Sequence, residues 1–367
     1  MIRLLAVDDS PLMRRLLAEI FAAEGDFEAR FARDGVEALA QLAQARADVV
    51  ILDVQMPHMD GLACLDRIML EQPCPVVMFS SLTEEGAKET LEALALGAVD
   101  FMPKPGGAVS LKLDEFGPAL VEKVRAAAKA QPPRVHRLIE RVRLRAGVEA
   151  GPRRRVRPPT PADRLTVLAP DTFAGDERLV LVGASTGGPP ALDALLAPLP
   201  AIFPWPIVVA QHMPASFTGA LARRLDQLCA AGVSEVTRPT PLAPGQVYIG
   251  RGDADVIVSR RAGELVALPA PSTPEHRWHP SVDRLTDSAL RVMPAERLVG
   301  VLMTGMGFDG AAAMTRLRQG GGRTIAEAEE TAVVWGMPGE LVRAGGAEFV
   351  LPLGEIARRL LMLATQP

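Results

Sequence analysis

The 367-residue sequence has few cysteines, few histidines and no long hydrophobic run. No apolar segment approaches the roughly eighteen residues of a membrane-spanning helix, so we expect no membrane insertion. The amino terminus, MIRLLAVDDSPLMRR, meets acids early and lacks a small-residue cleavage site, which excludes a typical signal peptide. A net charge of −4 gives no general reason to expect nucleic-acid binding.

The three cysteines, Cys64, Cys74 and Cys229, are scattered and show no CxxC spacing. They fit reduced thiols in a cytoplasmic protein, where they act as small buried hydrophobes rather than metal ligands. The length suits two domains, each large enough to bury its own core.

Residues 1–122 alternate short apolar runs with amphipathic helical segments, and this pattern predicts a five-stranded parallel sheet with helices on both faces. The predicted strands cover residues 3–8, 27–32, 48–53, 75–80 and 99–104, and helical patterns cover residues 10–23, 35–45 and 84–97.

Residues 131–164 differ in composition from the flanking regions, with ten arginines against three acids and prolines clustered at both ends. We predict an interdomain linker over residues 123–177. A basic run of this kind is more often a solvated tether than a contact to nucleic acid or a membrane surface, and its role stays open.

Residues 178–367 contain a second α/β pattern without a fixed-period repeat. Strands are predicted over residues 178–185, 206–212, 246–250, 256–260, 264–268, 298–305 and 348–353. The middle strands are separated by short turns, which predicts an antiparallel edge or hairpin on a mostly parallel, doubly wound sheet.

Polar residues end the predicted strands of the first domain. Asp8 and Asp9 follow the first strand and Asp53 the third, so the three carboxylates should converge at one sheet edge. Their mutual repulsion favours a hard cation, and oxygen ligands of this kind suit Mg²⁺. Ser80 and Lys104 end the fourth and fifth strands, where they could contact a phosphoryl group.

The segments AVDDS, ILDVQMPHMDG, MFSS and FMPKP resemble, in order and spacing, the response-regulator receiver domain, which has a flavodoxin-like fold. The resemblance implies that Asp53 accepts a phosphoryl group from a histidine kinase. It further implies that Mg²⁺ is held by Asp8, Asp9 and Asp53. Ser80 and Lys104 would sense the phosphoryl oxygens, and Phe101 would be the aromatic switch residue.

The segment LVGASTGGPPALDAL contains a formal G-x-S-x-G match at Ser185, where a strand should end and a helix begin. Glycines allow a tight turn, and the helix amino terminus offers N–H groups to an anion. A phosphate-cradling loop has similar residues, so this stretch alone leaves a nucleophile and a phosphate loop equally open. A clean dinucleotide-binding fingerprint is absent.

Two further residues follow strands that should end at the same edge as Ser185. His212 comes directly after its strand, and Asp309 lies in a glycine-rich loop before an alanine-rich helix. Serine, histidine and aspartate are the parts of a nucleophilic triad. Asp309 could instead cap the helix that follows it, and we expect the two roles to compete. The chain order Ser–His–Asp differs from that of α/β-hydrolases.

The segments VGASTGGP, QHMP, HPSVDRLTDSA and TGMGFDGA resemble the chemotaxis-type protein-glutamate methylesterases, in which a receiver is fused to a serine esterase. The resemblance implies Ser185 as nucleophile, His212 as general base and acid, and Asp309 as its orienting partner. Backbone N–H groups of Met306 and Thr186 would form the oxyanion hole.

The same resemblance implies hydrolysis of glutamate γ-methyl esters on methyl-accepting chemoreceptors, deamidation of receptor glutamines, and no cofactor for the esterase reaction. It also implies that the unphosphorylated receiver obstructs the esterase cleft. We expect a cytoplasmic monomer with residues 178–367 as the catalytic domain. His279 is expected to be structural or substrate-facing, and His276 and His58 to lie on the surface.

Two alternatives remain at this stage. A response regulator can carry a non-catalytic output domain, such as a DNA-binding helix-turn-helix, although a strand-rich segment of this length does not fit a compact one. The catalytic fold could also serve as a binding or signalling module without turnover.

Overall fold

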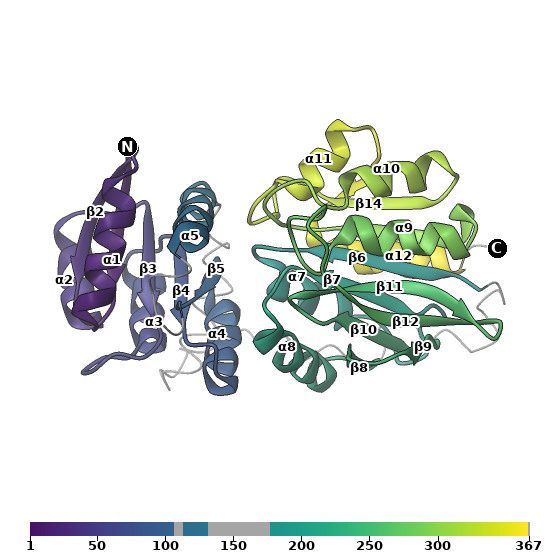
Figure 1. The fold of residues 1–367 in the computed structure, drawn as a ribbon, viewed down its shortest axis with the longest axis horizontal. Coiled ribbons are helices and arrows are strands. Elements are labelled where there is room, and N and C mark those ends of the chain that lie inside the picture. Colours follow the sequence, from purple (N-terminus) through teal and green to yellow (C-terminus); the bar gives the residue numbers. More distant parts are fainter. Residues whose placement is uncertain (106–112, 131–176, 366–367) are drawn as a thin grey trace, which may run out of the picture. The chain divides into compact units, whose positions relative to one another are not determined.

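The computed structural model describes residues 1–105, 113–130 and 177–365. The chain divides into two compact units, Met1–Ala150 and Gly151–Pro367, and Figure 1 shows the elements of each. The predicted linker over residues 123–177 begins inside a helix, α5 (Leu113–Ala127), and its arginine-rich part lies outside the described residues. The domain boundaries therefore stay predictions.

The first unit is a five-stranded sheet in the order β2-β1-β3-β4-β5, and every strand pair is parallel. This order is that of flavodoxin-like folds and confirms the predicted architecture. The elements are β1 (Ile2–Val7), α1 (Pro11–Ala22), β2 (Phe27–Ala32), α2 (Gly35–Gln44), β3 (Val49–Asp53), α3 (Gly61–Glu71), β4 (Val76–Ser80), α4 (Glu84–Leu96), β5 (Asp100–Pro103) and α5.

Side-chain caps fix where four helices of this unit begin. Ser10, Asp34, Asp60 and Thr83 each accept a hydrogen bond from the backbone N–H three residues later, at the start of α1, α2, α3 and α4. Such a cap satisfies one of the N–H groups that a helix leaves unpaired and stabilises the helix by about 1 kcal/mol. These caps thereby hold the strand-to-helix loops of this unit at defined positions.

The second unit contains a seven-stranded sheet, a three-stranded sheet and flanking helices. Its elements are β6 (Leu179–Ala184), α7 (Gly188–Leu196), β7 (Ile207–Gln211), α8 (Ala215–Leu228), β8 (Gly232–Val236), β9 (Thr240–Pro241), β10 (Gln246–Gly250), β11 (Ala254–Arg261), β12 (Glu264–Pro271), α9 (Val282–Val292), η3 (Ala295–Arg297), β13 (Leu298–Leu302), α10 (Ala311–Gln319), β14 (Arg323–Glu327), α11 (Met337–Arg343), β15 (Phe349–Leu351) and α12 (Leu353–Thr365).

The seven strands run β15-β14-β13-β6-β7-β10-β8, and all their pairs are parallel. From β6 the chain first continues on one side, to β7, and later returns on the other, to β13. Such a switch in strand order opens a crevice at the carboxyl ends of the strands, where α/β proteins bind their ligands. The loops after β6, β7 and β13 all meet at this point.

The antiparallel strands differ in one respect from the prediction. β11 and β12 pair as a hairpin, and β9 adds to β12, but these three strands form a separate sheet rather than an edge of the parallel one. The predicted strand at residues 246–250 is a parallel member of the large sheet, as β10. Tertiary packing explains the difference, because β11 packs against α9, which local turn spacing cannot indicate.

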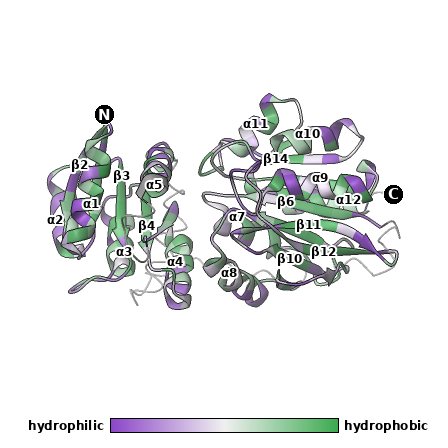
Figure 2. Ribbon diagram, in the orientation of Figure 1, coloured by the Kyte–Doolittle hydropathy of each residue, from purple (hydrophilic) through white to green (hydrophobic). Residues whose placement is uncertain are grey.

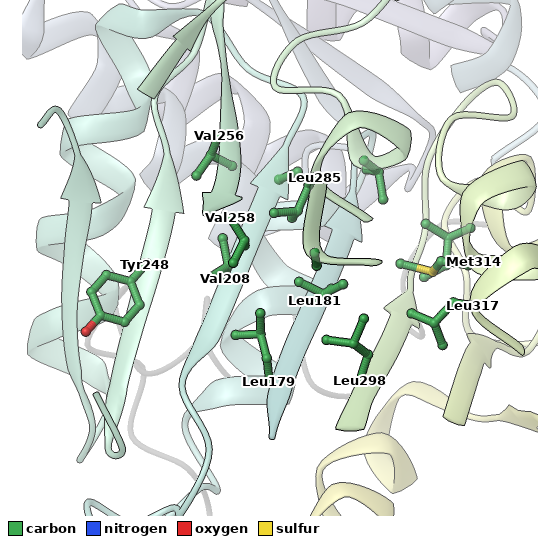
Figure 3. Close-up of a cluster of buried hydrophobic side chains, with 14 of the residues drawn as sticks. Leu179, Leu181, Val208, Tyr248, Val256, Val258, Leu285, Leu298, Met314 and Leu317 are labelled. Atoms are coloured by element: carbon green, nitrogen blue, oxygen red, sulfur yellow. The ribbon is translucent and has the colours of Figure 1, made fainter. Parts of the chain in front are cut away.

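Alternate residues of the parallel strands build the core on one face of the large sheet. Figure 3 shows Leu179 and Leu181 of β6 near Leu298 of β13, with Leu285 of α9 and Met314 of α10 in the same cluster. All five side chains are fully buried. Figure 2 shows β3 and β6 as hydrophobic, as expected for strands covered on both faces.

The cysteines carry no disulfide, as predicted. Cys64 and Cys74 are buried, and burial raises the pKa of each thiol to about 12, so both are unreactive at neutral pH. Cys229 is half-buried. Among the residues that the structure describes, no helix has the length and apolar composition needed to cross a bilayer.

Candidate active site

The turn after β6 holds Ser185 at the carboxyl edge of the large sheet. The Ser185 N–H donates to the Thr304 carbonyl at 3.0 Å, and the Gly188 N–H closes the turn on the Ser185 carbonyl at 2.7 Å. Gly187 has φ +76°, which a side chain would strain, and a Cβ there would lie 2.7 Å from Val333. The side chain of Ser185 makes no hydrogen bond within the described residues, so its hydroxyl remains available.

His212 follows β7 and lies at the same edge. Its backbone N–H donates to the Ala184 carbonyl at 3.0 Å, which continues the β6–β7 pairing to the residue before Ser185. The buried Gln211 side chain donates to the Ser185 carbonyl at 2.9 Å and to the His212 carbonyl at 3.1 Å. The two loops are therefore joined through one amide group.

The imidazole of His212 is paired with Asp309. Its Nε2 lies 2.8 Å from Asp309 Oδ2, and the two side chains are only 7% and 5% exposed. The buried Nδ1 has no hydrogen-bond partner among the described residues. Because the carboxylate can only accept when ionised, this pairing selects the tautomer with the proton on Nε2 and leaves the Nδ1 lone pair as the proton acceptor.

The structure brings His212 and Asp309 together, but it does not form a hydrogen bond from Ser185 to the imidazole. Catalytic hydrogen bonds are often long in free enzymes and tighten when substrate binds. The assignment of the complete triad therefore remains a proposal that rests on the shared sheet edge and the His212–Asp309 pair.

Asp309 also caps a helix, but not the one that follows it. Its Oδ2 accepts from the Val282 N–H at 2.7 Å, and its Oδ1 accepts from the Asp283 N–H and the Ser281 hydroxyl, each at 3.0 Å. These groups form the start of α9. The expected competition between capping α10 and orienting His212 does not arise, because Asp309 contacts the start of α9 and the N-cap residue of α10 is Gly310, which has no side-chain cap.

The capping is reciprocal. Asp283, in the first turn of α9, accepts from the Ala313 N–H at 2.8 Å and so satisfies the start of α10, the helix that Asp309 precedes. Asp283, which lies in α9, thus contacts the start of α10. Asp309, which precedes α10, contacts the start of α9. The motifs HPSVD and GFDGA are distant in sequence, and the hydrogen bonds that their two aspartates accept hold them together.

These contacts keep Asp309 ionised despite its burial. Burial by itself would raise the pKa of the carboxyl group, but the hydrogen bond and charge of His212 and the N–H groups of α9 outweigh it and lower the pKa. A carboxylate held in this state can stabilise the imidazolium that forms when His212 takes a proton.

The loop after β13 reaches the turn that carries Ser185. Gly305 lies so close to Ser185 that an added Cβ would be 2.8 Å from the Ser185 Cβ, which explains why a glycine stands there. The backbone N–H of Met306, the next residue, donates to no acceptor among the residues described. This N–H is available to an acceptor, and the contributions of Met306 and Thr186 to an oxyanion hole both stay predictions.

The receiver-type cluster lies at the carboxyl edge of the five-stranded sheet. Side-chain oxygens of Asp8, Asp9 and Asp53 all lie within 4.8 Å of one another. Lys104 Nζ is 2.7 Å from Asp53 and 2.9 Å from Asp8. Burial raises the pKa of Asp53 to about 6, although Lys104 opposes this shift. Three acids against one cation leave a negative charge that a divalent cation would neutralise, so the donor set fits Mg²⁺.

The remaining predicted receiver residues occupy neighbouring strand ends. Ser80 is buried at the end of β4, and its hydroxyl donates to the Gly86 carbonyl at 3.1 Å. The Lys104 N–H donates to the Ser80 carbonyl at 2.7 Å, which ties the two strand ends together. Phe101 on β5 is buried, with its side chain inside the unit. Their roles in sensing a phosphoryl group remain predictions.

Known proteins resemble the chain over nearly its whole length. A protein-glutamate methylesterase/protein-glutamine glutaminase of Rhodopseudomonas palustris is 58% identical over 97% of this chain and 96% of that protein. A homologue with the same name from Rhodospirillum rubrum is 52% identical over 98% and 95% of the two chains. Residues 180–360 match the CheB methylesterase family, and residues 4–113 match the response regulator receiver domain.

The chain belongs to the CheB methylesterase family. Its esterase domain resembles a solved structure, the CheB methylesterase catalytic domain of Thermotoga maritima, with a TM-score of 0.50 and 38% sequence identity. That match covers 51% of this chain and 99% of the other, so the second unit corresponds to a whole solved domain.

Among the side chains that sequence reasoning missed, Trp278 lies nearest to His212. Trp278 stacks on the His212 ring, with centroids 6.0 Å apart and planes at 5°. Phe308, 60% exposed, packs edge-on against Trp278 with centroids 5.0 Å apart. Trp278 covers one face of the imidazole, and Phe308 adds exposed apolar surface next to Trp278. The scarcity of tryptophan, with three in the chain, was the only available signal.

Two further histidines, His276 and His279, lie close to Ser281 and Asp255 near the start of α9. His279 Nδ1 lies 2.9 Å from Asp255, a fully buried acid that also accepts from the Ser281 N–H, so His279 braces the start of α9. His58 is exposed, as expected. His276 is half-buried, with its Nδ1 3.3 Å from the Ser281 hydroxyl, so it lies on the surface only in part.

Proposed function

We propose that this chain is a phosphorylation-regulated esterase that hydrolyses glutamate γ-methyl esters on methyl-accepting chemoreceptors and deamidates receptor glutamines. The observation that carries the proposal is the 2.8 Å His212–Asp309 pair beside the Ser185 turn, with the imidazole Nδ1 left unpaired. The names of its relatives, protein-glutamate methylesterase/protein-glutamine glutaminase, support this substrate class.

In the first half-reaction, Ser185 Oγ attacks the γ-carbonyl carbon of the ester while His212 Nδ1 takes the hydroxyl proton. Asp309 stabilises the resulting imidazolium through Nε2. The carbonyl oxygen becomes an oxyanion that accepts from the backbone N–H groups of Met306 and Thr186, and one such donor is typically worth about 3 kcal/mol. The C–O bond to methoxide breaks, and methanol leaves with the proton from His212.

In the second half-reaction, water attacks the acyl-serine while His212 takes one of its protons. The tetrahedral species collapses, the proton returns from His212 to Ser185, and the product glutamic acid loses its remaining proton to solvent as it is released. The net reaction consumes one water and yields one methanol. A glutamine side chain presents the same electrophilic carbon, so its hydrolysis at the same site yields glutamate and ammonia.

The receiver domain supplies regulation. We infer that Asp53 accepts a phosphoryl group from a histidine kinase, with Asp8, Asp9 and Asp53 as the Mg²⁺ ligands. The cation, when bound, neutralises charge on the transferred phosphoryl oxygens. Lys104 already neutralises part of the charge of Asp8 and Asp53 through contacts of 2.9 Å and 2.7 Å, and its ammonium group can pair with the new phosphoryl group.

We further propose that the protein works in the cytoplasm as a monomer, with chemoreceptors and a chemotaxis-type kinase as its partners. Free thiols at Cys64, Cys74 and Cys229 suit a reducing compartment. The alternative of a non-catalytic output domain is less well supported, since it gives the buried His212–Asp309 pair no role.

The direct test is incubation of the full chain with a methylated chemoreceptor, with methanol and receptor carboxylate as the products measured. We expect methanol release in proportion to the loss of receptor methyl ester. A receptor whose methylation sites are replaced by alanine is the control and should release none. Failure to release methanol with a small-molecule phosphodonor present would refute the proposal.

Phosphorylation is expected to raise the rate. We propose that the unphosphorylated receiver limits access to Ser185. The unphosphorylated full chain should therefore release methanol more slowly than the phosphorylated chain. Asp53→Asn should abolish the response to a small-molecule phosphodonor, and a fragment from Arg178 onward should be active without it. Measured methanol release that is equal for all four samples would contradict regulation while leaving the esterase proposal intact.

A further inference from the structure

Glu327 is a buried acid that the mechanism above does not use. It ends β14 and has no exposed surface. Its Oε2 accepts from the Thr304 N–H at 2.8 Å, and its Oε1 accepts from the Thr331 hydroxyl at 3.0 Å. A fully buried carboxyl group is costly unless its hydrogen bonds serve the structure around it, so these two partners indicate what it does.

Thr304 is the junction between the nucleophile turn and the oxyanion loop. Its carbonyl accepts from the Ser185 N–H at 3.0 Å, and its hydroxyl donates to the Thr186 carbonyl at 2.8 Å. Gly305 and Met306 follow it directly in the chain. Any displacement of the Thr304 backbone therefore moves the nucleophile and the predicted oxyanion donors relative to each other.

The segment after Glu327 closes the same network. The Val334 N–H donates to the Thr304 hydroxyl at 3.0 Å, and the Gly305 N–H donates to the Val334 carbonyl at 3.0 Å. The Trp335 indole N–H donates to the Glu327 carbonyl at 2.9 Å. The Glu327 side chain thus contacts the Thr304 N–H directly. The segment that follows Glu327 contacts the Thr304 hydroxyl through the Val334 N–H.

We infer that Glu327 is a positioning residue, which holds the Thr304 backbone so that the Ser185 turn and the Met306 loop keep the geometry needed for attack and oxyanion binding. This role rests on the proposed esterase function. The chain of hydrogen bonds runs from the Glu327 carboxyl group through the Thr304 peptide to the Ser185 N–H. Glu327 itself touches neither substrate nor reacting atoms.

The role requires an acceptor at this position rather than a negative charge. Burial raises the pKa of Glu327 to about 7, although the hydrogen bonds from Thr304 and Thr331 oppose the shift. In either protonation state, a carboxyl oxygen can accept from the Thr304 N–H. A glutamine has the same shape, and its carbonyl oxygen can accept from Thr304 while its amide donates to Thr331.

The test compares Glu327→Gln with Glu327→Met, which keeps the length but removes the acceptor. We expect the glutamine variant to stay within about threefold of the parent in kcat, and the methionine variant to lose about 10- to 100-fold in kcat with KM changed less than about threefold. Thr324→Val is the matched control, since it removes buried hydrogen bonds to Gly346 and Glu348 from the same strand. It should lower the melting temperature without lowering kcat.

Amide hydrogen exchange on the full chain tests the inference without turnover. Glu327→Met should accelerate exchange in peptides covering residues 183–188 and 303–308, whereas Thr324→Val and Glu327→Gln should not. If the parent releases no methanol, the proposed function fails and the exchange result still decides the positioning role. Unchanged exchange and kcat in Glu327→Met would overturn the inference, as would a glutamine variant as impaired as the methionine variant.

Discussion

Replacing Ser185 with alanine is expected to lower kcat for methanol release by about 10⁶-fold, because the acyl-enzyme route is lost entirely. The Ser185 hydroxyl makes no hydrogen bond within the described part of the chain, so its removal should leave the fold unchanged. The backbone contacts of the turn, including the 3.0 Å bond from the Ser185 N–H to Thr304, do not depend on the side chain. Methanol release from a methylated receptor is the measurement, with the melting temperature recorded alongside.

Ser234→Ala provides the matched control for this change. Ser234 is exposed on β8, so the same loss of one hydroxyl should leave both the rate and the melting temperature as in the parent. Parental methanol release by the Ser185 variant would exclude Ser185 as the nucleophile. It would leave the fold and family of the chain untouched.

Asp309→Asn is expected to lower kcat by about 10⁴-fold, since an amide can donate to His212 and select the wrong imidazole tautomer. The change also removes one acceptor from the start of α9, where Val282 and Asp283 donate to the carboxylate. A lost helix cap costs about 1 kcal/mol, so the melting temperature should fall by a few degrees. Rate and stability are therefore both measured.

Asp283→Asn separates these two effects. It alters the reciprocal cap, at the Ala313 N–H, while the Asp283 backbone N–H can still donate to Asp309. We expect a comparable loss of stability with a far smaller loss of kcat. If the two variants lost activity equally, the effect of Asp309 would be structural and its role in orienting His212 would be wrong.

Much of the fold could be predicted because several of its strands are continuous runs of hydrophobic residues. Continuous buried runs such as β3 and β4 of the receiver and β6 of the esterase domain have no other plausible place than a parallel sheet covered on both faces. β14 was missed, because it begins with arginine and threonine and ends with glutamate. Its hydrophobic signal is too short to stand out, and the acid at its end was overlooked with it.

The site was predictable to the extent that strand ends determine proximity. Ser185, His212 and Asp309 follow parallel strands of one sheet, so their placement at one edge follows from topology. The helix that Asp309 caps could not be deduced, because the sequence neighbour of a capping residue is usually its partner and here it is not. Trp278 could not be identified from the sequence either, because its stacking on the His212 ring is set by tertiary packing alone.

The exchange of caps between α9 and α10 has a consequence for the integrity of the enzyme. If the first turn of α9 frays, Asp309 loses two of its N–H donors and His212 loses a fixed orienting partner in the same event. If the proposed mechanism holds, local unfolding of the first turn of α9 inactivates the site before the domain as a whole unfolds. Under the proposed function, a copy of this chain with that turn unfolded would have no methylesterase activity.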